Sequence, residues 1–164
     1  MRGPRAFFLV GPTASGKTEV GQWIAEQGGY AILSADSMLV YRGLDIGTAK
    51  PDVEQRRRVR YWAVDVVEPT EAFSVASFLA IARQAVANCA EGRLLVVGGS
   101  GMYVKCLTDG LRSLPQAGPE VRARWRSVFE ERGVGGLQEA LRKLSPAWWE
   151  ALSDTRNSRR LLRA

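Results

Sequence analysis

The sequence predicts an α/β fold in which a parallel sheet is covered by helices. One observation is the alternation of short apolar segments with segments of helical spacing over residues 1–110, which is typical of parallel strands joined by helical crossovers. Another is that the apolar segments are continuous, so we expect the strands to be buried on both faces. A third is the motif "GPTASGKT" at residues 11–18, a type of loop that links a strand to a helix.

The first elements are predicted on both sides of that motif. Residues 6–11 ("AFFLVG") are apolar and aromatic, and they predict a short buried strand. Residues 17–29 show helical spacing and end at a pair of glycines, which is a common stop signal for a helix. Residues 30–36 ("YAILSAD") predict a second strand, which ends at Asp36.

The later elements continue the alternation. The charged residues 52–60 predict a helix, and residues 61–69 predict a third extended segment. A serine cap opens an amphipathic helix over residues 74–92. Residues 93–99 ("RLLVVGG") form the most continuous apolar strand, and residues 100–110 predict a short helix.

The character of the sequence changes after residue 110. Helical patterns follow one another without a strand pattern, so we predict an α/β core at residues 1–110 and a helical segment at 111–164. The helical patterns occupy residues 113–133, 135–144 and 145–154. We expect three tryptophans to form the small core of this segment, the alternative being a platform for base stacking: Trp125, Trp148 and Trp149.

Positive charge is concentrated in the helical segment. Residues 1–110 hold 12 Lys and Arg against 11 Asp and Glu, a net charge of +1, whereas residues 111–164 hold 11 against 6, a net charge of +5. This excess favours a polyanionic partner such as a nucleic acid. The alternative is a basic helical surface that is merely solvated.

Composition argues against several classes of protein. The chain of 164 residues has no histidine, and its two cysteines, Cys89 and Cys106, lack metal-site spacing, which argues against a zinc site and a disulfide framework. We expect both cysteines to be small buried hydrophobic residues in a reducing cytoplasm. No apolar run approaches 18 residues, and the apolar start is too short for a signal peptide, so no membrane contact is expected.

The motif at residues 11–18 predicts a phosphate-binding loop, and with the flanking elements a P-loop NTPase-like sheet. Its small residues let backbone N–H groups surround phosphate oxygens, and the helix N-terminus adds partial positive charge. Lys17 is expected to reach the terminal phosphates, and the Thr18 hydroxyl is the natural ligand for Mg²⁺. The predicted binding residues are Gly11, Pro12, Thr13, Ala14, Ser15, Gly16, Lys17 and Thr18.

Asp36 is the candidate general base. The strand at 93–99 ends in glycines and Ser100 without a carboxylate, so it lacks the acidic residue that typical P-loop ATPases use for magnesium. Asp36 ends the other strand instead, where a carboxylate facing the phosphates suits the deprotonation of a nucleophile, as in small-molecule kinases. The alternative is that Asp36 only caps a loop.

Four motifs in order give a specific resemblance. They are "GPTASGKT", "DSMLVYRGLDIGTAKP" (36–51), "VVEPTEAFSVASF" (66–78) and "VGGSGMYVKCLTDGL" (97–111). Together with "LPQAGPEVRARW" and "NSRRLLRA", they resemble the tRNA dimethylallyltransferases, also called IPP transferases, over nearly the whole chain. The resemblance implies that the loop holds dimethylallyl diphosphate with Mg²⁺. It also implies transfer of the dimethylallyl group to the exocyclic amine of the adenine next to the anticodon.

The resemblance also implies roles for individual residues. Asp36 is the base, Lys17 stabilises the leaving diphosphate, Ser100 replaces a threonine that binds the diphosphate or the nucleotide, and Arg122 lies near the reacting group. A short segment, "RRLLR" at 159–163, contacts tRNA. The implied tRNA-binding residues are Asp36, Ser37, Met38, Leu39, Ser100, Arg122, Arg159, Arg160, Leu161, Leu162 and Arg163. Because an adenine in a stacked loop is out of reach, we expect it to be flipped into a pocket.

The sequence departs from the family pattern at four points. Leu39 stands where the family generally has glutamine, Tyr61 and Trp62 replace a pair of histidines, and Met102 replaces a leucine. Family members also continue for about as long again after the segment that matches "LLRA". We therefore expect residues 111–164 to be an incomplete part of the family's helical domain.

Other functions stay open at this stage. One is a P-loop kinase of a small alcohol, which lacks a clear arginine-rich lid in the usual place although "EQRRRVR" at 54–60 could imitate one, or a relative that prenylates free adenine nucleotides. Another is a non-catalytic RNA-binding fragment of the family. The expected partners are dimethylallyl diphosphate and the anticodon stem-loop of tRNA, and the expected state is a monomer.

Overall fold

The computed structural model describes residues 6–90, 92–111 and 117–164, and the chain divides into two compact units, Met1–Arg112 and Ser113–Ala164. Residues 1–5 lie outside the described residues. They include the beginning of the N-terminal segment that we expected to be too short for a signal peptide. Most of the proline-containing entry to the helical segment, at 112–116, also lies outside the described residues. Each unit has a core of its own.

The Met1–Arg112 unit is built on a parallel sheet, which confirms the predicted α/β class. Its strands lie in the order β1-β4-β2-β3, and the pairs β1–β4, β4–β2 and β2–β3 are all parallel. Parallel neighbours require crossover connections, and helices supply them. The strands are β1 (Ala6–Val10), β2 (Ala31–Ser34), β3 (Tyr61–Trp62) and β4 (Leu94–Gly98).

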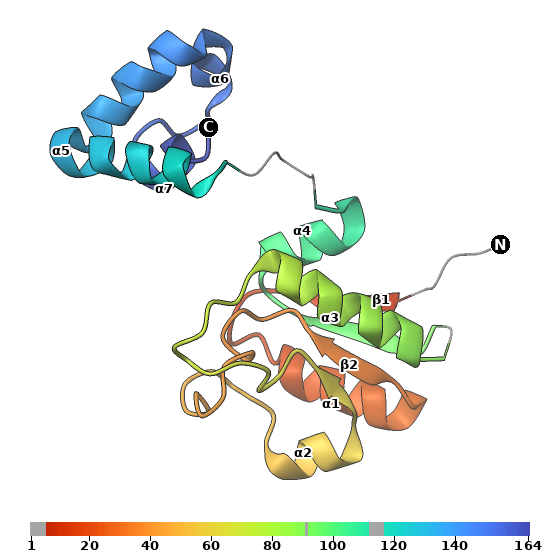
Figure 1. The fold of residues 1–164 in the computed structure, drawn as a ribbon. Helices are drawn as coiled ribbons and strands as arrows, with labels where there is room; N and C mark the ends of the chain where they lie inside the picture. The colour runs from red at the N-terminus through yellow and green to blue at the C-terminus, as the bar shows by residue number, and fades with distance from the viewer. Residues whose placement is uncertain (1–5, 91, 112–116) are drawn as a thin grey trace. The chain divides into compact units, whose positions relative to one another are not determined.

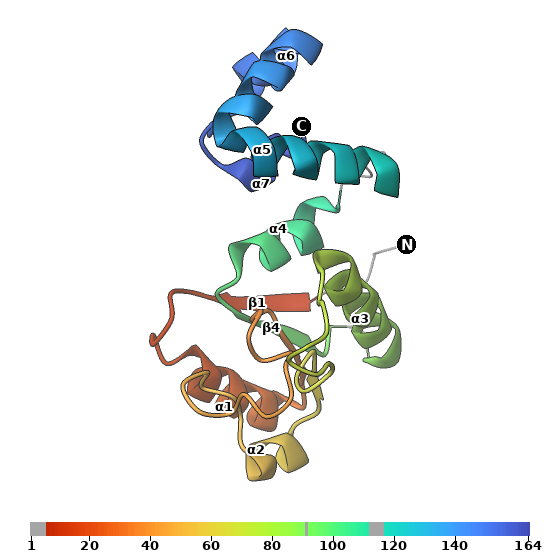
Figure 2. The ribbon, with the colours of Figure 1, turned by 60° about the vertical axis from the view of Figure 1, so that its left-hand side comes forward.

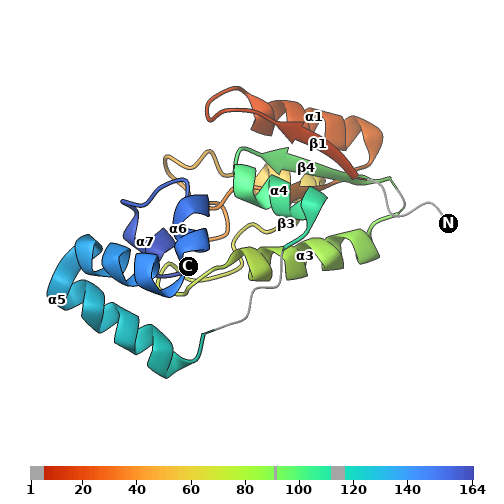
Figure 3. The same cartoon turned by 90° about the horizontal axis from the view of Figure 1, so that it is seen from above.

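Helices cover both faces of this sheet (Figures 1 and 3). Successive residues of a strand face opposite sides, so Ile32 packs with Ala25 of α1 while Leu33 packs in a second core with Phe78 of α3. The aromatic ring of Phe78 is stacked on Tyr103 of α4 at a centroid distance of 4.1 Å. The helices are α1 (Lys17–Gly28), α2 (Val53–Arg58), α3 (Val75–Asn88) and α4 (Gly101–Asp109).

Two features of the strands differ from prediction. The extended segment expected at 61–69 forms a strand only at Tyr61–Trp62, because Ala63 and Asp65 adopt positive φ angles of 60° and 52°, which interrupt extended backbone. The expectation of strands buried on both faces is wrong for β1, where Phe7 and Phe8 are 54% and 42% exposed. β1 is an edge strand of the described sheet, so its apolar side chains are less covered than those of β4.

The structure partly agrees with the prediction that both cysteines are small buried hydrophobic residues. Cys89 and Cys106 are both free thiols, and both are half-buried against the core that contains Phe78. They therefore pack as small apolar residues, although neither is fully buried.

The Ser113–Ala164 unit is helical. It contains α5 (Pro119–Leu144), α6 (Pro146–Ala151) and α7 (Ser158–Leu161). The two patterns predicted at 113–133 and 135–144 join in α5, which changes direction at Gly133 (φ 62°, ψ −156°), as Figure 2 shows. Although α5 has 26 residues, no helix in the described parts of the chain combines the length and apolar character needed to cross a membrane.

A small core holds this unit together. Leu137, Leu141 and Leu161 are buried, and Trp125 and Trp149 pack against them. Two of the three tryptophans therefore have the predicted core role, whereas Trp148 is 53% exposed. The sequence did not predict α7, because four residues give too little periodicity; the Asn157 side chain caps it by accepting hydrogen bonds from the backbone N–H groups of Arg159 and Arg160.

A charged cluster fixes the long loop between β2 and α2. Lys50, whose side chain is 1% exposed, donates hydrogen bonds of 2.7 Å to both Asp65 Oδ1 and the Tyr41 carbonyl oxygen, and its ammonium group is 2.7 Å from Asp45. The guanidinium of Arg56 also contacts Asp65. Burial alone would raise the pKa of Asp65, but the hydrogen bonds from Lys50 and Arg56 outweigh it and hold that pKa below its ordinary value. Burial likewise lowers the pKa of Lys50, yet its hydrogen bonds to Asp45 and Asp65 raise it overall.

We expect Asp65→Asn to lower the free energy of unfolding by about 2–3 kcal/mol near pH 7, because it leaves a buried ammonium group short of a partner. The lowered pKa of Asp65 stabilises the fold above about pH 4. This contribution is lost as the pH falls through the pKa of Asp65 in the folded protein. The raised pKa of Lys50 stabilises the fold below about pH 10.5 and loses its effect as the pH rises above that. Urea unfolding at about pH 3, 7 and 11 measures both contributions.

The exposed ion pair between Arg57 and Glu54 provides the control, because it also joins an arginine to a carboxylate but has both side chains about 70% exposed, at 71% and 68%. Glu54→Gln should change the free energy of unfolding by less than about 0.5 kcal/mol at pH 7. Equal effects of the Asp65 and Glu54 substitutions would contradict the role given to the buried cluster.

Candidate active site

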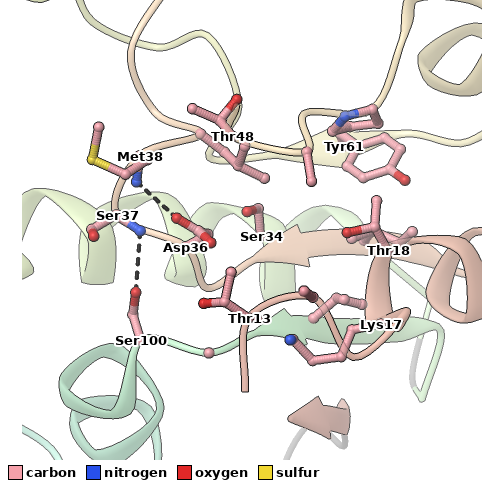
Figure 4. Close-up of a pocket in the computed structure, with 18 of the residues that line it drawn as sticks. Thr13, Lys17, Thr18, Ser34, Asp36, Ser37, Met38, Thr48, Tyr61 and Ser100 are labelled. Atoms are coloured by element: carbon pink, nitrogen blue, oxygen red, sulfur yellow. Dashed lines mark hydrogen bonds between the residues drawn. The ribbon is translucent and has the colours of Figure 1, made fainter. Parts of the chain in front are cut away.

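A cavity of about 400 Å³ opens where the strands β1, β2 and β4 end. Loops after the carboxyl ends of parallel strands are where α/β proteins place ligands. Lys17 and Thr18 enter the cavity from the first turn of α1, Asp36 from just after β2 and Ser100 from just after β4 (Figure 4). Residues that the sequence predicted from separate motifs therefore share one cavity.

The β1–α1 loop has the conformation of a phosphate-binding loop. Ala14 and Gly16 have positive φ angles of 62° and 77°, and Gly16 caps the N-terminus of α1. Lys17 Nζ donates hydrogen bonds to the Pro12 carbonyl oxygen and, over 3.3 Å, to Ser15 Oγ. The lysine thus lies along its own loop, where an anion bound at the start of α1 can take over these donors. Of the eight predicted loop residues, those that line the cavity are Thr13, Ala14, Lys17 and Thr18.

Backbone contacts orient Asp36. Its Oδ1 atom accepts a hydrogen bond of 2.8 Å from the backbone N–H of Met38, whereas Oδ2 accepts none from the described residues. The neighbouring backbone N–H of Ser37 donates to Ser100 Oγ over 3.2 Å, and the Ser100 N–H donates to the Ala35 carbonyl oxygen over 3.1 Å. The half-buried carboxylate therefore has one oxygen held and one oxygen available within the cavity.

Two glycines bring the strand ends together. A Cβ atom on Gly98 would lie 2.3 Å from the Ala35 carbonyl oxygen, and one on Gly99 would lie 2.9 Å from the Gly11 carbonyl oxygen. Real Cβ atoms do not approach backbone this closely, so only glycine permits the spacing of these segments. On sequence alone this pair indicated only the absence of a carboxylate. Its position at the end of the most apolar strand was the signal that was missed.

Comparisons with known proteins identify the family. Residues 39–164 match the family model described as IPP transferase. The chain belongs to the IPP transferase family. This confirms the family that the ordered motifs predicted.

Curated relatives of this IPP transferase chain carry a specific name. The chain is similar to the tRNA dimethylallyltransferase of Thermus thermophilus, with 46% identity over 158 residues that cover 95% of this chain and 52% of the relative. It is 41% identical to the tRNA dimethylallyltransferase of Deinococcus radiodurans over 166 residues, which cover 100% of this chain and 54% of the relative. The chain thus spans about half the length of the curated relatives it matches.

Solved structures give the same fold. The full-length tRNA isopentenylpyrophosphate transferase from Bacillus halodurans superposes with a TM-score of 0.64 at 35% identity, covering 98% of this chain and 54% of that one. A eukaryotic dimethylallyltransferase crystallised in states described as acting on tRNA gives a TM-score of 0.73 at 19% identity, over 97% of this chain and 40% of that one. At that identity the second likeness supports the fold alone.

Two of the residues that depart from the IPP transferase pattern, Leu39 and Tyr61, line the cavity. Leu39 is 7% exposed and lines it together with the exposed residues Ser37 and Met38. The Leu39 carbonyl oxygen accepts a hydrogen bond of 3.0 Å from the Asp65 backbone N–H. The leucine is therefore part of the cavity wall, and its side chain offers an apolar surface in place of an amide.

Tyr61 lines the same cavity, and sequence reasoning did not assign it a role. Its hydroxyl donates to Gln22 Oε1 over 2.5 Å. Burial, together with the nearby charges of Glu26 and Asp52, raises the pKa of Tyr61 to about 12. The phenol is therefore protonated near neutral pH and acts as a hydrogen-bond donor to Gln22. Ser34 is a further cavity residue that sequence reasoning missed.

The predicted RNA-contacting residues of the Ser113–Ala164 unit are exposed with one exception. Arg122, in the first turns of α5, is exposed, as are Arg159, Arg160, Leu162 and Arg163. Leu161 is only 6% exposed and packs with Leu137 and Leu141. Its side chain holds α7 in the core, and its assignment as a tRNA contact stays a prediction.

The cavity contains an incomplete set of ligands for a metal ion. Within residues 6–90, 92–111 and 117–164, no group of three or more His, Cys, Asp or Glu residues is arranged to hold one. Mg²⁺ bound with a phosphate ligand does not need such a group, because phosphate oxygens and water fill most of its coordination sites. The half-buried Thr18 hydroxyl beside Lys17 fits that mode of binding.

Proposed function

We propose that this IPP transferase chain transfers the dimethylallyl group of dimethylallyl diphosphate to the exocyclic amine of the adenine next to the anticodon of a tRNA. The observation that carries the proposal is that Asp36 lines the same cavity as Lys17 and Thr18. A phosphate site and a carboxylate that share one cavity are suited to a reaction in which an anion leaves and a proton is removed.

The proposed reaction is a substitution at the first carbon of the dimethylallyl group. The C–O bond to diphosphate breaks, and diphosphate leaves with the electron pair. The amine nitrogen of adenine forms the new C–N bond, and its proton passes to the available oxygen of Asp36. Lys17 and the N–H groups at the start of α1 stabilise the negative charge that grows on diphosphate. Ser100, at the start of α4, contacts the diphosphate or the nucleotide.

Magnesium is the proposed cofactor. Thr18 would hold it beside the diphosphate, where the ion supplies positive charge to the leaving group. The chain's own residues provide the rest of this site through Lys17 and the loop backbone. The name of the similar Bacillus halodurans protein, tRNA isopentenylpyrophosphate transferase, supports a diphosphate ligand here.

The helical unit is the proposed tRNA-binding part, corresponding to the domain predicted at 111–164. The net charge of +5 over residues 111–164, from 11 Lys and Arg against 6 Asp and Glu, suits contact with the phosphates of an anticodon stem-loop. Arg122, Arg159, Arg160 and Arg163 are exposed and available for such contacts. The target adenine is proposed to flip out of its stack, with Ser37, Met38 and Leu39 contacting it. We also propose that the protein acts as a cytoplasmic monomer.

A transfer assay tests this function. The chain is incubated with Mg²⁺, labelled dimethylallyl diphosphate and unmodified tRNA, and label is measured in the RNA. We expect labelled RNA, and loss of label in Lys17→Ala because the diphosphate loses its cationic contact. Label on free AMP without RNA would indicate a nucleotide prenyltransferase, and ATP-dependent phosphorylation of a small alcohol would indicate a kinase. Binding of tRNA without transfer of label to the RNA would indicate a non-catalytic RNA-binding fragment.

A further inference from the structure

Ser34 is a buried polar residue without a hydrogen-bond partner. Its side chain is 2% exposed, and within the described parts of the chain its hydroxyl oxygen has no hydrogen-bond partner. A buried hydroxyl that lacks a partner costs about 1–3 kcal/mol relative to a satisfied one. Such groups are few in native proteins, and a binding site is one place where they occur. Trp62 Nε1 is the other buried side-chain atom of this kind among the described residues.

The position of Ser34 distinguishes it from Trp62. Side chains alternate along a strand, so Ile32, Ser34 and Asp36 share one face of β2 and its extension. All three line the cavity, whereas Trp62 does not. Figure 4 shows the Ser34 hydroxyl directed into the same open space as the side chains of Asp36 and Thr18. Ser34 therefore lies two residues before the proposed base, Asp36, on the same face of the strand, and deeper in the cavity.

The chemistry of the surroundings limits what Ser34 can bind. The charged residues that line the cavity are Lys17 and Asp36. Ser34 is neutral, so it is poorly suited to balance the charge of a phosphate by itself, but its hydroxyl both donates and accepts hydrogen bonds. A water molecule in the coordination shell of a cation meets that requirement, since Mg²⁺ beside a phosphate retains several waters.

We propose that the Ser34 hydroxyl accepts a hydrogen bond from a water molecule bound to Mg²⁺. In this arrangement the same Mg²⁺ is held by Thr18 and the diphosphate. This inference rests on the proposed function, because it requires that the loop binds a magnesium-diphosphate group. It assigns to Ser34 a positioning role: the hydroxyl fixes the hydrated cation between the loop and Asp36 without binding the metal directly.

The test measures binding of inorganic pyrophosphate by calorimetry, with and without Mg²⁺. The two variants are Ser34→Ala and Trp62→Phe, each of which removes one unpartnered buried polar atom. We expect Ser34→Ala to weaken pyrophosphate binding about 5–10-fold in the presence of Mg²⁺, the loss of about one hydrogen bond. Without Mg²⁺ it should bind as tightly as the wild type. Trp62→Phe should leave both affinities unchanged.

Unfolding experiments without ligand provide a second measurement. If Ser34 has no protein partner, Ser34→Ala should not lower the free energy of unfolding, whereas a loss above about 1 kcal/mol would show a structural hydrogen bond and overturn the inference. Equal weakening with and without Mg²⁺ would place the hydroxyl on the diphosphate instead and also overturn it. So would unchanged binding in Ser34→Ala when the wild type binds normally.

Failure of the proposed function has a different signature. In that case wild-type protein would not bind pyrophosphate with Mg²⁺, or Lys17→Ala would bind it as tightly as wild type. A site that binds pyrophosphate through Lys17, yet shows no effect of Ser34, would leave the proposed function standing and remove only the role of Ser34.

Discussion

Asp36→Asn is expected to reduce prenyl transfer to tRNA by about 10²–10⁴-fold, the usual range for loss of a general base. Asparagine keeps the size of the side chain, and its amide oxygen can still accept the hydrogen bond that the Met38 N–H donates over 2.8 Å. It cannot take the proton of the adenine amine. Single-turnover measurement of label in RNA gives the rate of the transfer step.

Binding of pyrophosphate with Mg²⁺ should change less than about twofold in the same variant, because Lys17 and the loop backbone provide the contacts to the diphosphate. Asp109→Asn is the matched control. It makes the same chemical change at an exposed residue at the end of α4, outside the cavity, and should retain wild-type transfer. Near-normal transfer by Asp36→Asn would remove the proposed base and leave Asp36 as a loop residue that holds the Met38 N–H.

Gly98→Ala is expected to lower the free energy of unfolding by at least about 3 kcal/mol and to abolish transfer. The new Cβ would lie 2.3 Å from the Ala35 carbonyl oxygen and 2.4 Å from the Ala35 carbonyl carbon. Because both are backbone atoms, a rotamer change cannot relieve the overlap, and β2 and β4 must separate at their ends. Asp36 follows Ala35 directly, so its carboxylate shifts with the strand, and a displacement of about 1 Å costs about 10²-fold in rate.

Gly101→Ala is the control for this substitution. Gly101 lies three residues later, its φ is not positive, and a Cβ there meets no atom within 4 Å. Since Gly101 begins α4, alanine should leave stability unchanged or raise it by up to about 1 kcal/mol. Urea unfolding of both variants measures the difference, and similar stabilities would contradict the close approach of the two strands.

The parts of the site that sequence predicted are those that depend on local patterns. Lys17 and Thr18 follow from a loop motif whose spacing fixes its own backbone, and Asp36 follows from its place at the end of an apolar strand. Their meeting in one cavity depends on β4 lying between β1 and β2. The positions of Lys17, Thr18 and Asp36 were thus predictable separately, whereas the cavity that joins them required the strand order.

Other features depend on contacts between distant segments. Tyr61 lies in the cavity because it pairs with Ile32 across the β2–β3 ladder, and the early end of β3 follows from positive φ angles at Ala63 and Asp65. The exposure of β1 depends on its place at the edge of the described sheet. Leu161 is buried because α5 and α7 pack together, which the segment "RRLLR" at 159–163 does not reveal by itself.

All residues that line the cavity belong to the Met1–Arg112 unit. The proposed base, the phosphate loop and the serine at the start of α4 are joined there by backbone contacts such as Ser100 N–H to Ala35 carbonyl oxygen. Under the proposed function, the groups that break and form bonds therefore belong to this unit. We therefore expect substitutions at the exposed residues Arg159, Arg160 and Arg163 to change tRNA binding without altering these groups.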